Sequence, residues 1–89
     1  MKIDFKKSFS RDLKEINDKD IMQKVKAVIN SIENTPNLME IKNVKQLTSS
    51  GKYYRIRIGD YRMGIKLENE IVVFVRFLHR KEIYRYFPF

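Results

Sequence analysis

Several residue types that build small functional sites are absent or scarce in this chain. It has no cysteine, which excludes disulfide bonds and zinc–thiolate sites and fits a reducing compartment. His79 is the only histidine, so no histidine cluster is available to bind a metal. No apolar run approaches the ~18 residues of a membrane-spanning helix, and the N-terminus lacks the pattern of a signal peptide. We therefore expect a cytoplasmic protein with no metal, no cofactor and no membrane contact.

The chain length limits what the fold can contain. Its 89 residues allow one domain, 1–89, and the 43% hydrophobic content is ordinary for a globular protein. A chain of this length buries only about 60–65% of its unfolded surface. The core must be small, so we expect any chemistry to take place on a surface or in a shallow groove.

Positive charge is the strongest signal in the composition. Lys and Arg number 19 against 11 Asp and Glu, which gives a net charge of +8. Most of the excess lies in residues 45–89, where ten basic side chains face four acidic ones and six arginines occur. Arginine binds two phosphate oxygens at once through its planar donors. The second half is therefore predicted to bind a polyanion.

Hydrophobic spacing predicts a short strand at residues 2–5 followed by two helices. One apolar stripe runs from Phe9 to Ile16 and a second from Ile21 to Ile32, with Asn17-Asp18 between them to cap the second helix. Asn34-Thr35-Pro36 ends that helix. We expect an antiparallel helix hairpin whose apolar face covers a sheet, and an irregular polar loop over residues 37–51.

Residues 52–67 alternate with a period of two and predict a β-hairpin. Gly59-Asp60 separates the two runs, as in a type II′ turn. The predicted pairs are Ile58 with Tyr61, Arg57 with Arg62, Ile56 with Met63, and Arg55 with Gly64. Together with the helices, this hairpin predicts an α+β fold with a mostly antiparallel sheet.

The nearly continuous apolar run 71–78 predicts a third, interior strand. A three-residue loop, Glu68-Asn69-Glu70, keeps the apolar residues on one face, because a slip of one residue would invert the strand. It pairs Leu67 with Ile71 and Arg62 with Arg76. The helix-covered face is then predicted to hold Tyr54, Ile56, Ile58, Tyr61, Met63, Ile65, Val73, Val75 and Phe77.

The opposite face of this predicted sheet is basic. It carries Tyr53, Arg55, Arg57, Arg62, Gly64, Lys66, Phe74 and Arg76. Arg57, Arg62 and Arg76 fall in one row, although directly opposed like charges cost roughly 0.2–1 kcal/mol. Phosphate binding explains this row better than a merely solvated face does. Gly64 leaves a gap where a nucleotide backbone could approach, or else marks a bulge.

The end of the third strand adds further candidates. His79 is expected beside the basic face, where it would contact phosphate or move a proton, although a lone histidine can also be structural. Tyr84 could stack on a base, donate a proton or pack. The tail 86–89 is predicted to pack on the core, with a partner-binding patch as the alternative.

The order of these elements, with the segments YRIRIGDYR (54–62) and HRKEIYR (79–85), resembles the RelE/ParE superfamily of toxins over the whole chain. The resemblance implies a helix hairpin on one face of a twisted, mostly antiparallel sheet. RelE-like members are ribosome-dependent endoribonucleases that cut mRNA, whereas ParE-like members poison DNA gyrase. Both kinds are silenced by a cognate antitoxin. A plain nucleic-acid-binding module is a third possibility.

In RelE-like toxins basic residues of the central strands hold the mRNA, and a tyrosine near the C-terminus stacks on a base. At matching positions this chain has Arg55, Arg57, Arg62, the pair Arg80-Lys81, and Tyr84. The loop before the central strands, Val44-Lys45-Gln46-Leu47, has no carboxylate, although some relatives use a glutamate there as general base.

The resemblance and the charge pattern together give one predicted site. The catalytic candidates are Arg57, Arg62, His79, Arg80, Lys81 and Tyr84. The RNA-binding candidates are Lys45, Arg55, Arg57, Lys66, Arg76 and Arg85. The expected reaction is metal-independent attack by the RNA 2′-hydroxyl, in which Arg57 and Arg62 would stabilise the phosphorane. Lys45, Lys81 and His79 are open choices for proton transfer. The expected partners are a cognate antitoxin and mRNA on the ribosome, with contacts to 16S rRNA.

Overall fold

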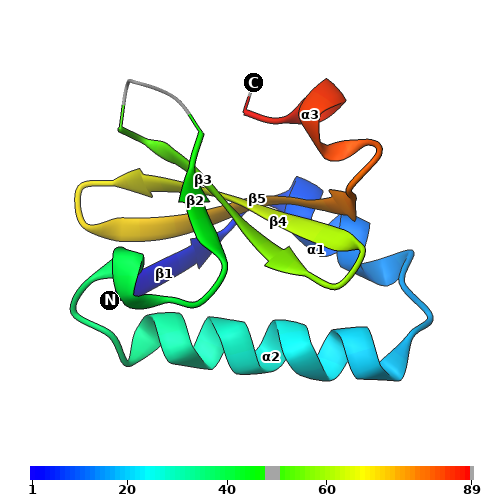
Figure 1. The fold of residues 1–89 in the computed structure, drawn as a ribbon, viewed down its shortest axis with the longest axis horizontal. Coiled ribbons are helices and arrows are strands. Elements are labelled where there is room, and N and C mark those ends of the chain that lie inside the picture. Colours follow the sequence, from blue (N-terminus) through cyan, green and yellow to red (C-terminus); the bar gives the residue numbers. More distant parts are fainter. Residues whose placement is uncertain (48–50, 89) are drawn as a thin grey trace.

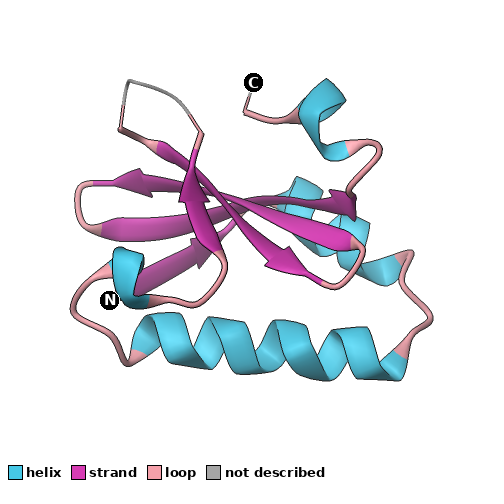
Figure 2. Ribbon diagram, in the orientation of Figure 1, coloured by secondary structure: helices cyan, strands magenta, loops and turns pink. Residues whose placement is uncertain are grey.

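A computed structural model describes residues 1–47 and 51–88, and within them five strands form one sheet (Figures 1 and 2). The elements in chain order are β1 (Lys2–Phe5), α1 (Lys7–Lys14), α2 (Lys19–Glu33), the 3₁₀ turn η1 (Leu38–Glu40), β2 (Val44–Gln46), β3 (Tyr53–Ile58), β4 (Tyr61–Glu68), β5 (Ile71–His79) and α3 (Ile83–Tyr86). The strand order is β1-β5-β4-β3-β2, and the β1–β5 pair alone is parallel among them. The predicted α+β fold is confirmed.

Helix α2 lies across one face of the sheet, and α3 lies on the other side (Figure 1). We call the face opposite α2 the open face. The main core lies between α1, α2 and the sheet. Its fully buried members are Phe9, Val25, Ile32, Ile56, Met63, Ile65, Val72, Phe74 and Phe77. In the described part of the chain no helix is long and apolar enough to cross a membrane.

Helix α2 begins where the sequence predicts. The Asp18 carboxylate accepts hydrogen bonds from the backbone N–H groups of Asp20 (2.9 Å) and Ile21 (3.2 Å). These donors have no partner within the helix, so the cap stabilises its first turn. The helix ends at Glu33, just before the Asn34-Thr35-Pro36 stop.

We expect Asp18→Ala to lower the free energy of unfolding by about 1 kcal/mol, because two N–H groups lose their acceptor. Urea unfolding followed by circular dichroism measures this loss. Lys19→Ala, one residue further on and without a capping bond, is the matched control and should change stability by less than about 0.5 kcal/mol. An equal loss in both variants would contradict the capping role.

The first hairpin confirms the predicted register. Ile58 pairs with Tyr61, Arg57 with Arg62, and Arg55 with Gly64. Gly59 has a φ of +58°, as a type II′ turn requires at its first central position. Tight turn chemistry and strict alternation therefore determine this half of the sheet.

The second hairpin differs from the prediction. Its loop has two residues, Asn69 and Glu70, which both adopt positive φ (51° and 66°), and Glu68 pairs with Ile71. Such a turn matches the twist of the flanking strands. The predicted three-residue loop is wrong because a bulge at Val75 restores the apolar pairing further along the strand.

This bulge changes which residues share a row. Arg62 lies opposite Leu78, and Arg76 lies opposite Gly64. The predicted row of Arg57, Arg62 and Arg76 is therefore wrong beyond its first pair. Phe74 also belongs to the helix-covered face, where its ring centroid lies 5.3 Å from that of Phe9, so its prediction for the basic face is wrong.

Sequence reading missed strand β2. Val44–Gln46 pairs with β3 at the sheet edge, inside the segment predicted to be irregular. Three residues are too few to show an alternation. The Ser49-Ser50 part of that predicted loop lies outside the described residues.

Candidate nucleic-acid interface

Four basic side chains gather on the open face, on β2, β3 and β4. Lys45 pairs with Arg55, and Arg57 pairs with Arg62, so the backbone pairing places these residues in two adjacent rows. Arg80 adds a fifth, because its N–H donates to the carbonyl of Asp60 (2.8 Å), two residues before Arg62. We call these five residues, Lys45, Arg55, Arg57, Arg62 and Arg80, the basic surface.

The three arginines of β3 and β4 contact neutral acceptors. Arg62 donates to the carbonyls of Gly59 and Tyr61, both at 2.9 Å. Arg55 donates to the Asn43 carbonyl (3.0 Å) and Arg57 to the Asn43 Oδ1 (3.5 Å). Among the described residues none of the three pairs with a carboxylate. Their charge is therefore available to an anionic ligand.

Arg62 is crowded by other positive charges. Partial burial lowers the pKa of its guanidinium most, and repulsion from Arg55, Arg57 and Arg80 lowers it further. Arginine keeps its proton at neutral pH despite such shifts. A phosphate bound here would offset this repulsion, so the strain favours an anionic partner.

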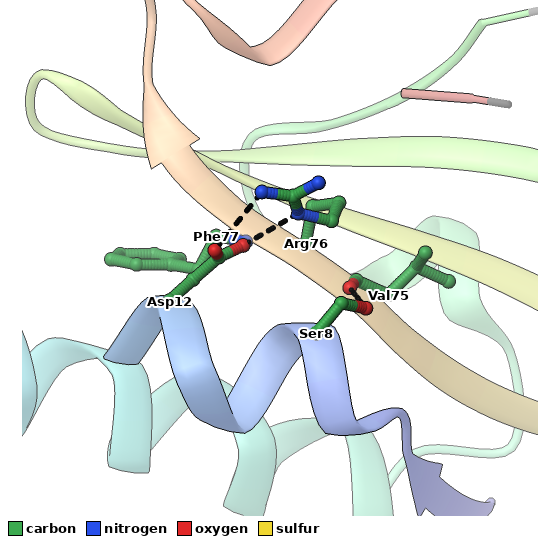
Figure 3. A network of polar contacts seen from close by, with 5 residues as sticks. All are labelled: Ser8, Asp12, Val75, Arg76 and Phe77. Carbon is green, nitrogen blue, oxygen red and sulfur yellow. Dashed lines mark hydrogen bonds and ion pairs between the residues drawn. The ribbon is translucent and has the colours of Figure 1, made fainter. Parts of the chain in front are cut away.

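Arg76 is held by helix α1, and Gly64 separates it from Arg55 of the basic surface. Its Nε and one terminal nitrogen donate to the two Asp12 oxygens at 2.8 Å and 3.1 Å, and Asp12 also accepts from the Phe77 N–H at 2.9 Å (Figure 3). The bidentate bond raises the pKa of Arg76. Next to it, the Ser8 hydroxyl donates to the Val75 carbonyl at 2.6 Å (Figure 3).

His79 ends β5 as predicted, but it points to the other side of the sheet. It alternates with Phe77, which is buried in the main core, and its ring lies 5.7 Å from that of Tyr61 on the same side. Its Nδ1 accepts the Lys81 N–H at 3.2 Å. The expected place of His79 beside the basic surface is therefore wrong, because a strand residue two positions after Phe77 lies on the same face as Phe77.

The C-terminal segment packs on the open face. Ile83 and Phe87 are fully buried there, whereas Tyr84 on the same segment is 53% exposed. Phe87 fills the space above Gly64, so the gap that was predicted to admit a nucleotide backbone is closed. The tail thus packs on the protein, although on the face away from the main core; Phe89 lies outside the described residues.

The remaining candidates are more dispersed. Lys66 forms an ion pair with Glu68 (3.0 Å), which lowers the pKa of that carboxyl. Arg80 lies 3.9 Å from Asp60, and its N–H donates to the Asp60 carbonyl at 2.8 Å. Lys81 and Arg85 are exposed. No group of three metal-binding side chains occurs in the ranges 1–47 and 51–88.

Two residues of the site had no clear sequence signal. Asn43, with a φ of 68°, holds both arginines of β3, and asparagine tolerates this conformation better than most residues. Asp12 lies inside the first apolar stripe and is buried. A buried carboxylate needs a partner, but the sequence does not show which residue that partner is.

Comparisons with known proteins match this fold and sequence over nearly the full length. Residues 3–84 match the family model of the ParE toxin of type II toxin–antitoxin systems. Toxin RelE3 of Methanocaldococcus jannaschii is 40% identical over 89 residues, which cover 99% of this chain and 100% of that protein. The chain belongs to the RelE/ParE toxin family.

Solved structures of family members share the fold. The RelB–RelE antitoxin–toxin complex from Methanococcus jannaschii has 38% identity and a TM-score of 0.80, covering 96% of this chain and 99% of the other. An archaeal RelE–RelB complex from Pyrococcus horikoshii has a TM-score of 0.74 at 20% identity, covering 92% and 97%, and this likeness concerns the fold alone.

Proposed function

We propose that this toxin is a RelE-like endoribonuclease that cleaves mRNA on the ribosome and is silenced by a cognate antitoxin. The observation that carries this proposal is the set of three arginines, Arg55, Arg57 and Arg62, on one exposed sheet face without a described carboxylate partner. The full-length identity to a RelE toxin supports the same branch. The antitoxin is expected to be acidic or amphipathic, because it must mask this surface.

In the proposed reaction the RNA 2′-oxygen attacks the adjacent phosphorus as its proton leaves. The 2′-O–P bond forms, the P–O5′ bond breaks, and the 5′-oxygen takes up a proton, leaving a 2′,3′-cyclic phosphate and a 5′-hydroxyl. Arg57 and Arg62 would stabilise the charge that develops on the phosphorane. The reaction requires no metal, because fixed cations supply this stabilisation.

The geometry narrows the choice of groups for proton transfer. Lys45 lies on the basic surface beside Arg55, whereas His79 faces the opposite side of the sheet. We therefore favour Lys45 and the exposed Lys81 over His79. Tyr84, which is exposed on the segment that packs on the open face, would stack on a base. Lys66, Arg76 and Arg85 would contact RNA only at the margin of this site.

Primer extension on a translated mRNA tests the proposal. We expect cuts within codons that appear only when the message is translated, because the ribosome positions the substrate. The control is the same mRNA with its start codon removed. The ParE-type family match makes gyrase poisoning the second candidate, and gyrase-dependent DNA breaks without mRNA cuts would replace the first. If the protein binds RNA but shows neither activity, it is a nucleic-acid-binding module without nuclease or gyrase-poisoning function.

A further inference from the structure

We propose that Phe87 is a positioning residue: its ring, seated on Gly64, fixes the segment 80–87 so that Tyr84 and Arg80 lie against Arg62. This inference rests on the proposed nuclease function and names a residue pair outside the predicted site. Phe87 would act through Tyr84 and Arg80 and would not itself touch RNA.

The C-terminal segment has its own small apolar anchor on the open face. Phe87 and Ile83 are both fully buried, and the Phe87 N–H donates to the Ile83 carbonyl at 2.9 Å. The Phe87 ring packs edge-on against Tyr53, with centroids 5.8 Å apart. This cluster lies on the opposite side of the sheet from the main core, and it holds the C-terminal segment in place.

Gly64 is the seat for this ring. A methyl group at position 64 would lie 2.8 Å from Cγ of Phe87 and 2.9 Å from both Cδ atoms. These atoms form the base of the ring, so rotation of the ring about its Cβ–Cγ bond cannot relieve the clash. Glycine inside a strand weakens it unless something needs the space, and here Phe87 needs it.

The seat lies next to the basic surface. Gly64 pairs with Arg55 and follows Arg62 by two residues, so it is on the same face. The Arg80 N–H donates to the Asp60 carbonyl at 2.8 Å and Phe87 sits on Gly64, so the segment that carries Tyr84 spans the stretch of β4 that carries Arg62. Tyr84 remains 53% exposed, although Ile83 before it and Phe87 three residues later are buried. The segment therefore presents Tyr84 outward from a fixed base, which favours a prepared geometry over one formed on binding.

A second anchor acts at the next residue. The Arg76 guanidinium lies 5.2 Å from the centre of the Tyr86 ring, and Asp12 holds that guanidinium by two hydrogen bonds. The segment is therefore held by Phe87 on Gly64 and by Tyr86 on Arg76. These two contacts are made two and three residues after Tyr84, so they restrict its movement relative to the sheet.

Gly64→Ala tests the seat in the full-length protein. We expect about tenfold slower cleavage of translated mRNA, and at least tenfold faster hydrogen exchange at the amides of Arg85 and Phe87, with the exchange of β5 amides unchanged. In a Phe87→Ala background, itself slow, adding Gly64→Ala should change both readouts by less than twofold, because the clash is gone. Phe87→Leu, which keeps an apolar anchor, should retain most of the activity.

Three results would overturn the proposal. The amides of the segment could keep their protection in Gly64→Ala, the exchange could rise while cleavage stays within twofold, or the two substitutions could act additively. If Gly64→Ala fails to fold, the comparison of Phe87→Ala with Phe87→Leu carries the test. Met39→Ala, which truncates an exposed apolar side chain of η1, is the control. If the wild-type protein cuts no mRNA, the proposed nuclease function is refuted. The hydrogen-exchange data test the contact of Phe87 with Gly64 independently of that function.

Discussion

Arg62→Ala is expected to slow mRNA cleavage about 100- to 1,000-fold, the usual loss when one stabiliser of a developing negative charge is removed. Arg62 lies at the centre of the basic surface and feels the charges of Arg55, Arg57 and Arg80. It is bonded to two backbone carbonyls, which fix its orientation. A fixed cation stabilises the transition state without reorganising, so its loss should act on the chemical step.

Single-turnover cleavage on programmed ribosomes measures this effect. Arg62→Lys keeps the charge but loses the planar fork and should recover only part of the rate. Arg11→Ala is the matched control, because Arg11 is exposed on α1 away from the open face. A rate for Arg62→Ala within threefold of wild type, with the fold intact, would remove Arg62 from the catalytic role.

Asp12→Ala is expected to lower the free energy of unfolding by about 2–4 kcal/mol, because it leaves a guanidinium and a buried N–H without their acceptor. The Asp12 side chain is 10% exposed and that of Arg76 25%, so solvent can replace only part of the lost contact. Urea unfolding measures the loss. Ser8→Ala, which removes one hydrogen bond from the same helix, should cost about 1 kcal/mol.

A double-mutant cycle separates the ion pair from the backbone contact. Adding Arg76→Met to Asp12→Ala should recover part of the stability, because no unpaired charge remains. The bond from the Phe77 N–H stays broken in both variants, so recovery should be incomplete. A loss below 0.5 kcal/mol in Asp12→Ala would show that water replaces the carboxylate, contrary to our reading.

The elements of this fold that can be predicted from the sequence are those that depend on residues close together in the chain. The Asp18 cap and the Gly59-Asp60 turn each depend on a few adjacent residues, and both are confirmed. The pairing of Arg57 with Arg62 follows from that turn alone. Two cations of the site could therefore be located without coordinates.

The parts that sequence reading misses depend on contacts between distant segments. A bulge at Val75 changes which residues of β5 face outward, and no residue type marks it. The bulge puts Phe74 on the helix-covered face and Val73, opposite Lys66, on the open face, and it takes Arg76 out of the row. The role of Gly64 could not be read either, because its partner Phe87 lies 23 positions later in the chain.

Helix α1 also blocks strands of other molecules from pairing with the edge of β5. Beyond the stretch paired with β1, the rim of β5 would expose an unsatisfied carbonyl at Val75 and an N–H at Phe77, but Ser8 and Asp12 occupy both. Unpaired rims of this kind are templates for aggregation. Because two side chains of α1 occupy these backbone groups, another copy of the toxin cannot pair with β5 at this stretch of its edge.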